Sequence, residues 1–324
     1  IVNGINIISG TTLNISNNLI GNLTAPAATG LNAINGINAS ATSTYSVYYN
    51  TIYLNASSTS ATTFGTSCMT FSSTATSFNS RNNILVNMST PAQEGSNATA
   101  NGIAAGLRRS SGTNGTVPAN YSTSSNNNLY WVNPTLGTNN HLTYVEGTAT
   151  VTNPFNTLAL FKTFLINRDQ ASVTESVSTA PGVFFQNFTA SNAAFLHLVA
   201  GITTQAESGA VNIASYTDDY DAEIRQGNGG YSGSGSAPDI GADEFSGVAA
   251  DLTGPAISYT PFANSSCTTD ITVSATITDL SGVNVLPMTK PRLYFKKTGD
   301  ANTYAGNTSA DNGWKYVEAT NAVS

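Results

Sequence analysis

Asn82-Asn83-Ile84-Leu85-Val86-Asn87 is a short apolar run that begins on two asparagines and ends on a third. Three stretches before and after it have related sequences: Asn17-Asn18-Leu19-Ile20-Gly21-Asn22, Asn50-Thr51-Ile52-Tyr53-Leu54-Asn55 and Asn127-Asn128-Leu129-Tyr130-Trp131-Val132. The steps between the first asparagines are 33, 32 and 45 residues. A second landmark, a glycine that opens a short alternation, recurs at Gly4, Gly30, Gly65 and Gly102. The chain therefore contains degenerate repeats, each of which predicts two short strands joined by polar turns.

These repeats favour a parallel β-solenoid. Thr, Asn, Gly and β-branched residues dominate them, and no 3.6-residue apolar period is sustained. Asparagine suits the turns because it tolerates the left-handed region, and asparagines stacked in successive coils can form amide ladders. A low-complexity linker is the alternative, but aliphatic and aromatic residues recur at the strand positions. We predict a right-handed parallel β-helix in which Ile52, Leu54, Ile84 and Val86 point inward.

Composition supports an uncharged stack. Only 9% of the 324 residues are charged, against about 25% in a typical domain, whereas 38 Asn, 37 Ser and 45 Thr are present. Stacked strands place like residues about 4.8 Å apart, so a ladder of like charges would repel. The net charge of −7 argues against nucleic-acid binding. No apolar stretch of about 18 residues occurs, so we expect no membrane insertion.

The domain organisation follows from uneven charge. Residues 218–251 contain eight acids and one base, whereas residues 290–297 contain four bases. A small-residue stretch closed by Gly254-Pro255 separates these zones and indicates a linker. We predict the β-helix over 1–247, a linker at 248–254, and a second module over 255–324.

The two ends of the chain and its two cysteines each lead to a further prediction. The chain begins at Ile1 without a signal sequence, and both ends are expected to be cuts in a longer polypeptide. Cys68 and Cys267 are 199 residues apart and are expected to be buried thiols rather than a disulfide. So few cysteines exclude a Cys-based metal site.

An ordered series of segments carries a family resemblance. The segments are Asn126–Trp131, Phe155–Lys162, Asp169–Val173, Pro181–Phe184, Ala194–Leu198, Thr217–Arg225 and Ala237–Phe245, the last of which contains Asp-Ile-Gly-Ala-Asp-Glu. This series resembles the C-terminal end of right-handed parallel β-helix domains in large secreted surface proteins of Bacteroidetes. The resemblance implies the fold, export by a type IX route and an extracellular, cell-surface location, but no single activity.

The chain departs from that family at two points. Ala222 stands where the family usually has glycine, and Gly227–Ser236 stretches the spacing between Arg225 and the Asp-Ile-Gly motif. Residues 154–166 predict a short helix, because Leu158, Phe161 and Leu165 lie on one face. In the resembling family this segment covers one side of the solenoid.

The last 70 residues predict a different β module. Apolar residues alternate with Thr and Ser over 271–278, and the segments 291–296 and 314–317 are typical of further strands. Together with the opening at 253–258 they look like an immunoglobulin-like β-sandwich. Such a domain needs about 100 residues, so we expect a partial one.

Catalytic residues are not expected. A β-helix lyase or galacturonase needs grouped carboxylates, but residues 1–200 contain only Glu94, Glu146, Asp169 and Glu175, of which only the last two flank one loop. Arg108-Arg109 could neutralise a uronate, although a solvated turn is the commoner role for such a pair. Of the two histidines, His141 and His197, the second is expected to be a core or rim residue rather than a base.

The acidic region leaves two interpretations open. Asp219, Asp221 and Glu223 have the spacing of a calcium loop, but Ile224 and Gly230 occupy the positions that need Gly and Glu. A structural calcium ion bound by other means is one interpretation, with candidate ligands Asp218, Asp219, Asp221, Asp239 and Asp243. The preferred one is that Arg225 pairs with Asp239 or Glu244 and closes the end of the domain. No other cofactor is expected.

The leading functional prediction is a non-catalytic structural or adhesive segment of a long extracellular surface protein. Its partners would be other segments of the same chain, identical subunits or a surface polysaccharide. The alternative is a polysaccharide-binding or polysaccharide-degrading β-helix with a surface groove of aromatic residues: Tyr45, Tyr48, Tyr53, Tyr130 and Trp131. These aromatics could equally be ladders in the core.

Overall fold

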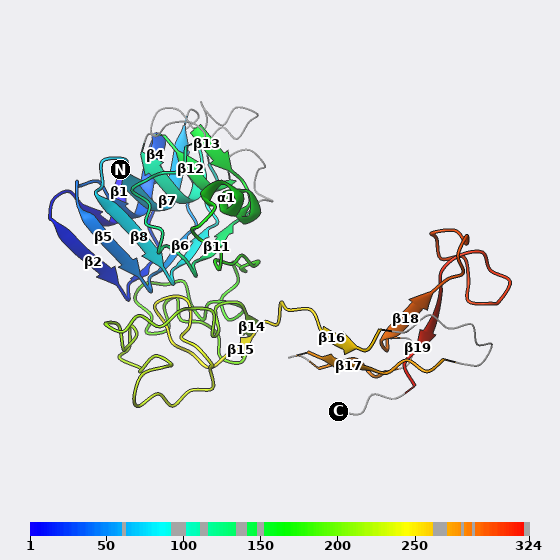
Figure 1. The fold of residues 1–324 in the computed structure, drawn as a ribbon. Coiled ribbons are helices and arrows are strands. Elements are labelled where there is room, and N and C mark those ends of the chain that lie inside the picture. Colours follow the sequence, from blue (N-terminus) through cyan, green and yellow to red (C-terminus); the bar gives the residue numbers. More distant parts are fainter. Residues whose placement is uncertain are drawn as a thin grey trace. The chain divides into compact units, whose positions relative to one another are not determined.

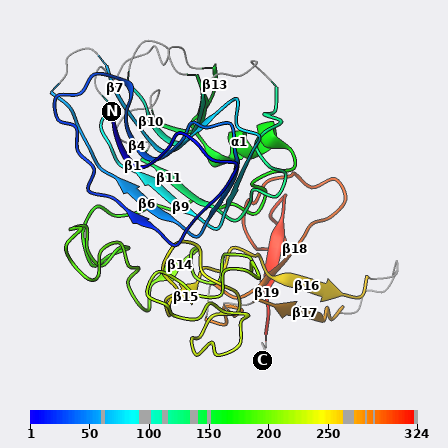
Figure 2. The same ribbon diagram turned by 90° about the vertical axis from the view of Figure 1, so that its left-hand side faces the viewer.

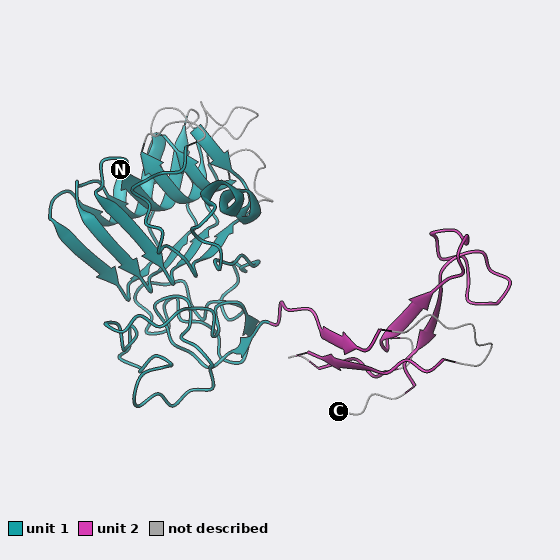
Figure 3. Ribbon diagram, viewed as in Figure 1, with its two compact units in different colours: residues 1–250 teal, residues 251–324 magenta. Residues whose placement is uncertain are grey.

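The computed structural model describes residues 1–59, 63–91, 102–110, 116–133, 141–147, 152–261, 271–279, 282–286 and 289–320. The chain divides into two compact units, residues 1–250 and residues 251–324 (Figure 3). Strands make up nearly all of the regular structure, and the described residues contain one α-helix, α1 (Leu158–Leu165).

Unit 1 is a β-solenoid of about four turns (Figures 1 and 2). The first sheet contains β1 (Val2–Ile7), β4 (Gly30–Ala39), β7 (Phe64–Ser72), β10 (Ala104–Ser110), β12 (His141–Glu146) and β13 (Thr152–Phe155). The second contains β2 (Thr12–Ser16), β5 (Thr44–Tyr48) and β8 (Ser77–Arg81). The third contains β3 (Leu19–Ile20), β6 (Thr51–Leu54), β9 (Ile84–Asn87) and β11 (Leu129–Val132). All neighbours pair in parallel except β12 and β13, which confirms the predicted solenoid.

Each of the first three turns has three strands rather than the predicted two. The additional strands form the second sheet, where Ser and Thr alternate with buried residues such as Tyr45, Val47 and Phe78. Neither a glycine nor an asparagine pair marks these strands, so counting landmarks does not reveal them.

The asparagine pairs have two separate roles, one for each position. Three first positions, Asn17, Asn82 and Asn127, have φ between 54° and 59°, and Tyr49 takes this position in the second turn. The second positions stack as a ladder of side-chain amides. Asn18 Nδ2 donates to Asn50 Oδ1 at 2.7 Å, and Asn50 and Asn83 each donate in the same way to the next member at 2.9 Å. Both predicted roles of asparagine are confirmed.

The prediction for Ile84 and Val86 is wrong. The register aligns Ile52 with Leu85 and Tyr53 with Val86, so the ladder position after Asn50 is Asn83, not Asn82. A shift of one residue moves a side chain to the other face of a sheet. Ile52, Leu54 and Leu85 therefore lie in the core of the solenoid, whereas Ile84 and Val86 are buried in a separate cluster on the outer face.

Aromatic stacking fills the interior, and α1 closes it beside β12 and β13 (Figure 1). The rings of Phe71 and Phe78 stack at 4.5 Å between centroids. Phe161 of α1 is fully buried and stacks on Tyr144 of β12 at 4.7 Å. Leu158 and Leu165 are also buried, which confirms the apolar face predicted for the helix. Thr157 begins the helix because its hydroxyl accepts a hydrogen bond from the Leu160 N–H.

The described residues of unit 2 form two small antiparallel sheets. One pairs β16 (Ala256–Tyr259) with β17 (Ala275–Thr278), and the other pairs β18 (Arg292–Phe295) with β19 (Lys315–Glu318). Apolar side chains of these strands remain exposed, including Ile257 and Leu293. The described residues therefore form antiparallel strands where the sequence predicts them, but not an immunoglobulin-like sandwich. Cys267 lies outside the described residues, whereas Cys68 is a buried free thiol.

Candidate functional site

Residues 166–247, called the loop layer below, cover the outer face of the third sheet (Figures 1 and 2). They contain a single two-residue strand, β14 (Thr203–Thr204), which pairs with β15 (Val248–Ala249). Apolar contacts fix this layer, because its residues share one cluster with the sheet. That cluster includes Tyr53, Ile84, Val86 and Leu129 from the sheet and Phe185, Leu196, Leu198 and Ile240 from the layer.

Because the loop layer has almost no paired strands, buried carboxylates accept many of the hydrogen bonds that its backbone N–H groups donate. Asp219 accepts hydrogen bonds from the backbone N–H groups of Asp221, Glu223 and Glu244. Asp239 accepts from Ser208 at 2.6 Å and Phe245 at 2.9 Å. A buried backbone donor needs a partner, and a carboxylate can accept from several donors at once. The buried carboxylates therefore hold the backbone of the loop layer in place by accepting its N–H groups.

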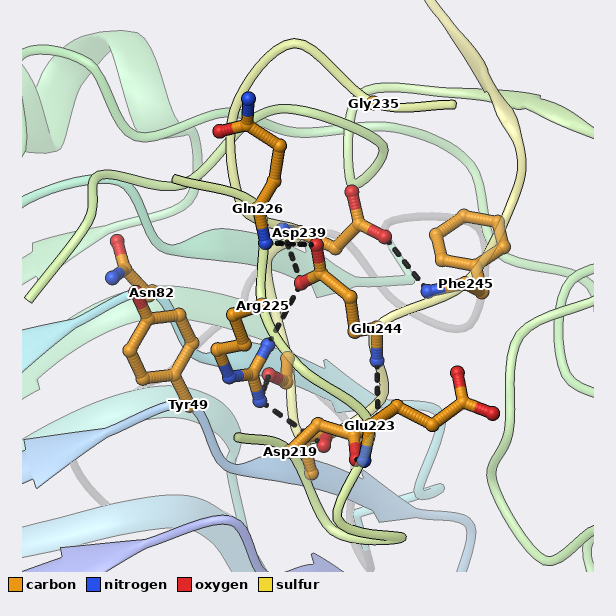
Figure 4. A network of polar contacts seen from close by, with 12 residues as sticks. Tyr49, Asn82, Asp219, Glu223, Arg225, Gln226, Gly235, Asp239, Glu244 and Phe245 are labelled. Atoms are coloured by element: carbon orange, nitrogen blue, oxygen red, sulfur yellow. Dashed lines mark hydrogen bonds and ion pairs between the residues drawn. The ribbon is translucent and has the colours of Figure 1, made fainter. Parts of the chain in front are cut away.

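Arg225 is the cation at the centre of this network (Figure 4). Its side chain is fully buried, and its Nη1 lies 3.2 Å from Glu244 Oε2. The guanidinium also donates to the carbonyls of Gly241 and Ala242 at 3.1 Å and lies 4.0 Å above the Tyr49 ring. The predicted pairing of Arg225 with an acid of this motif is confirmed for Glu244. Asp239 instead accepts backbone N–H groups.

The Asp-Ile-Gly-Ala-Asp-Glu motif brings the loop layer against the sheet. Gly241 has φ +108°, and a Cβ added there would lie 2.7 Å from Ile84 Cδ1. The Gly241 N–H donates to the Asn82 carbonyl, and the Ala242 N–H donates to Thr51 Oγ1, both at 2.9 Å. Only glycine combines this φ with so close an approach.

The first asparagines of the pairs hold the loop layer in place. Asn82 both donates to the Val211 carbonyl at 2.8 Å and accepts from the Val211 N–H at 3.1 Å. Asn127 donates to the Gly209 carbonyl at 3.0 Å. Asn17 donates to the Asp218 carbonyl at 2.8 Å and accepts from Arg225 at 3.2 Å. The asparagine pair therefore connects successive coils at its second position and attaches the loop layer at its first.

Burial changes the acidity of this network. It raises the pKa of Asp239 to about 8, and the nearby charge of Glu244 adds to the effect. It also raises the pKa of Asp243 to about 6, against the hydrogen bond from the Leu198 N–H. Desolvation raises the pKa of Glu244 as well, although Arg225 and two backbone donors counteract it. Asp239 therefore favours its protonated form near neutral pH.

The five calcium candidates do not converge as one set. The carboxylates of Asp219 and Asp239 are occupied by backbone donors, and Asp218 is exposed. Asp221 and Asp243 do come together, and the third member of their group is His197. His197 was not predicted to join them, because no motif links it to the acidic region. Its apolar neighbours made it look like a core or rim residue, and it is half-buried.

The proposed groove of aromatic residues is not present at the surface. Tyr45 and Tyr130 lie in the core of the solenoid, whereas Tyr48 and Tyr53 are buried with the loop layer. The Tyr53 ring lies 4.5 Å from the Phe188 ring, and Trp131 packs half-buried against the same cluster. Sequence alternation alone could not show that a second layer covers the outer face. The alternative, that these aromatics are part of the core, holds for Tyr45 and Tyr130, whereas the other three pack under the loop layer.

The remaining polar candidates also serve the framework. Arg108 is buried on β10 and donates to the Gly147 carbonyl at 2.8 Å, and Arg109 pairs with Glu146 at 3.3 Å. A solvated turn at these arginines is therefore wrong. Asp169 is buried among Tyr121, Asn128 and Ser172, whereas Glu175 bonds Thr204 and the Gln205 N–H. The two acids have no partner in common. His141 is buried beside the Ser89 carbonyl.

No family model matches this chain, and comparison with curated proteins and with solved structures finds no significant match. Among the described residues, no helix has the length and apolar character needed to cross a membrane.

Proposed function

We propose that this chain is a non-catalytic structural or adhesive segment of a long extracellular surface protein. One observation carries the proposal: the buried acids and arginines of unit 1 are engaged in hydrogen bonds and ion pairs inside the fold. Asp219, Asp239 and Glu244 accept backbone N–H groups, and Arg225 donates to backbone carbonyls. Proton-transfer catalysis needs titratable groups that can reach a substrate, whereas a stalk needs a braced, uncharged stack.

The open strand edges of the first coil support the same function. The strands β1, β2 and β3 each lie at the end of a sheet and have one neighbouring strand among the described residues. An open strand edge presents unpaired backbone groups that can pair with another strand. The partner would be another segment of the same protein or an identical subunit in a fibre.

The finer assignment rests on the sequence resemblance. It supports a right-handed β-helix from a type IX-exported surface protein of Bacteroidetes, with unit 2 as part of an immunoglobulin-like spacer. The antiparallel strand pairs of unit 2 agree with a spacer of that kind.

Cell-surface labelling tests this function. In the source cell, an antibody raised against residues 1–250 should label intact cells, and external protease should remove the signal. An in-frame deletion of residues 1–250 should reduce attachment of the cells to surfaces or to each other. Labelling that requires permeabilised cells, or attachment that the deletion leaves unchanged, would contradict the proposal.

A surface depression favours polysaccharide binding as a second candidate function. A depression of about 340 Å³ beside the Arg225 network is lined by Tyr231, Phe245 and the exposed Glu223, among others. An aromatic ring beside a carboxylate suits a sugar. Glycan-array binding that Tyr231→Ala abolishes would support this function over a purely structural one.

A further inference from the structure

A second polar cluster lies beside the Arg225 network, where three segments of the loop layer meet. It consists of His197, Asp221 and Asp243, whose donor atoms all lie within 4.8 Å of one another. Within it, His197 Nε2 lies 2.9 Å from Asp221 Oδ2. One imidazole nitrogen and two carboxylate oxygens at such separations form a ligand set for a divalent cation.

We propose that His197, Asp221 and Asp243 bind a divalent transition-metal cation of the Zn²⁺ class. The hydrogen bonding of the His197 imidazole supports this assignment independently of the two acids. His197 Nε2 is buried from solvent but makes no hydrogen bond, because its contact with Asp221 lacks hydrogen-bond geometry. A buried polar atom without such a partner is unusual in a folded protein. A cation bound at this nitrogen would supply its partner.

The backbone holds the three ligand residues in position. The Leu198 N–H, next to His197, donates to Asp243 Oδ2 at 2.7 Å and so joins two ligand-bearing segments. Asp219 accepts from the Asp221 N–H at 2.9 Å and from the Glu244 N–H at 2.8 Å, and so joins the third. Hydrogen bonds of this kind orient metal ligands before the metal binds. Asp219 is therefore a positioning residue for the site and not a ligand.

The ligand types select the metal and leave room for another ligand. Imidazole suits Zn²⁺, Cu²⁺ and Ni²⁺, whereas Ca²⁺ and Mg²⁺ prefer oxygen ligands alone. Two carboxylates balance the charge of a divalent ion. The Asp221 side chain is 44% exposed, so the site opens to solvent and water can complete the coordination. A bound ion would connect residues 197, 221 and 243 and stabilise a layer that has almost no regular structure.

Metal titration of the EDTA-dialysed full chain tests this site. ZnCl₂ alone, followed by calorimetry, should bind at one equivalent per chain. At about 100-fold excess over the dissociation constant it should raise the melting temperature of unit 1 by about 5 °C or more. Co²⁺ in its place should give visible absorption bands that His197→Gln removes.

Variants at the ligand positions distinguish a metal site from an ion-pair cluster. His197→Gln and Asp221→Asn should each weaken Zn²⁺ binding by about tenfold or more. Asp221→Asn changes a partly exposed side chain, so it remains informative even if His197→Gln does not fold. Asp218→Asn is the matched control and should bind Zn²⁺ as the unchanged chain does. Absence of Zn²⁺ binding would overturn the proposal, because His197 and the two acids would then be only an ion-pair cluster. Binding that both His197→Gln and Asp221→Asn retain, or tighter binding of Ca²⁺ that His197→Gln leaves unchanged, would also overturn it.

Discussion

Asn128 Nδ2 donates a hydrogen bond of 2.9 Å to Oδ1 of the buried Asp169. This bond ends the amide ladder that runs from Asn18 through Asn50 and Asn83, in which every side-chain NH₂ group donates toward the next coil. Asp169 Oδ1 also accepts hydrogen bonds from the hydroxyls of Tyr130 and Ser172. Asp169 therefore terminates the ladder, whereas backbone N–H groups of Asn18, Asn50 and Asn83 orient its rungs by donating to Oδ1 of the next asparagine.

Removing this terminal acceptor should destabilise unit 1. Asp169→Ala leaves the Tyr121 and Ser172 hydroxyls and one N–H of Asn128 Nδ2 without the acceptor they now have, and we expect a loss of roughly 3–5 kcal/mol in the free energy of unfolding. Asp169→Asn keeps one acceptor oxygen and should cost roughly 1–3 kcal/mol. Chemical denaturation measures both. Equal stability of the two variants would contradict a role for the acceptor atoms.

A negative charge introduced in the middle of the asparagine ladder should destabilise the protein more than the same charge at an exposed turn. In Asn83→Asp, an acceptor replaces the NH₂ group that donates to Asn128 Oδ1 and to the Val47 carbonyl. We expect a loss of about 3 kcal/mol or more, which lowers the melting temperature by roughly 10 °C. Asn55→Asp, at an exposed position, is the control and should change stability by less than about 0.5 kcal/mol. Similar melting temperatures for the two variants would exclude the ladder as a stabilising element.

Arg225→Ala should destabilise the loop layer because it leaves the buried Glu244 without its cation. The expected loss is about 3–5 kcal/mol, and Arg225→Lys should lose less because it keeps the charge. The control is Arg292→Ala, which removes an exposed ion pair with Glu318 in unit 2 and should leave the melting temperature of unit 1 unchanged. If Arg225→Ala has the same melting temperature as the unchanged chain, the Arg225–Glu244 pair contributes nothing measurable to stability.

Gly241→Ala tests the contact between the motif and the sheet. A Cβ at this position meets Ile84 Cδ1 at 2.7 Å and Thr51 Oγ1 at 2.8 Å, and φ is +108°. Strain and overlap together predict a loss of about 2–5 kcal/mol. Gly182→Ala has a positive φ but nothing within 4 Å, so it isolates the backbone strain and should cost about 1–2 kcal/mol. A lower melting temperature for Gly182→Ala than for Gly241→Ala would contradict a close approach of Gly241 to the sheet.

Stability should fall as pH rises from about 4 to about 8. Asp239 has a pKa of about 8 in the folded chain, above the value of about 4 expected when unfolded, so the folded state binds its proton more tightly in this range. The stabilisation is complete below about pH 4 and is lost as pH passes the folded pKa. Asp243 adds a smaller contribution that ends near pH 6. Melting curves at pH 5 and pH 8.5 should differ in the unchanged chain, and by less in Asp239→Asn. A higher melting temperature at pH 8.5 would show that Asp239 is ionised throughout.

The repeat of asparagine and apolar residues determined much of this fold. It predicted parallel coils, left-handed turns and the amide ladder, because these depend on local backbone preference and on a repeating spacing. The lone arginine among acids also predicted that Arg225 pairs with Asp239 or Glu244, because a buried network requires an opposite charge, and the structure selects Glu244.

Only the tertiary structure decided which faces are covered and which distant residues meet. Ile84 and Leu85 are both apolar, and only the pairing register places one outside and the other inside the solenoid. Tyr53 could not be assigned to a groove or to a core without the loop layer that covers it. His197, Asp221 and Asp243 converge because that layer folds back on itself without a periodic pattern. Repetition in sequence specifies neighbouring coils, whereas contacts between irregular segments depend on how the whole layer packs.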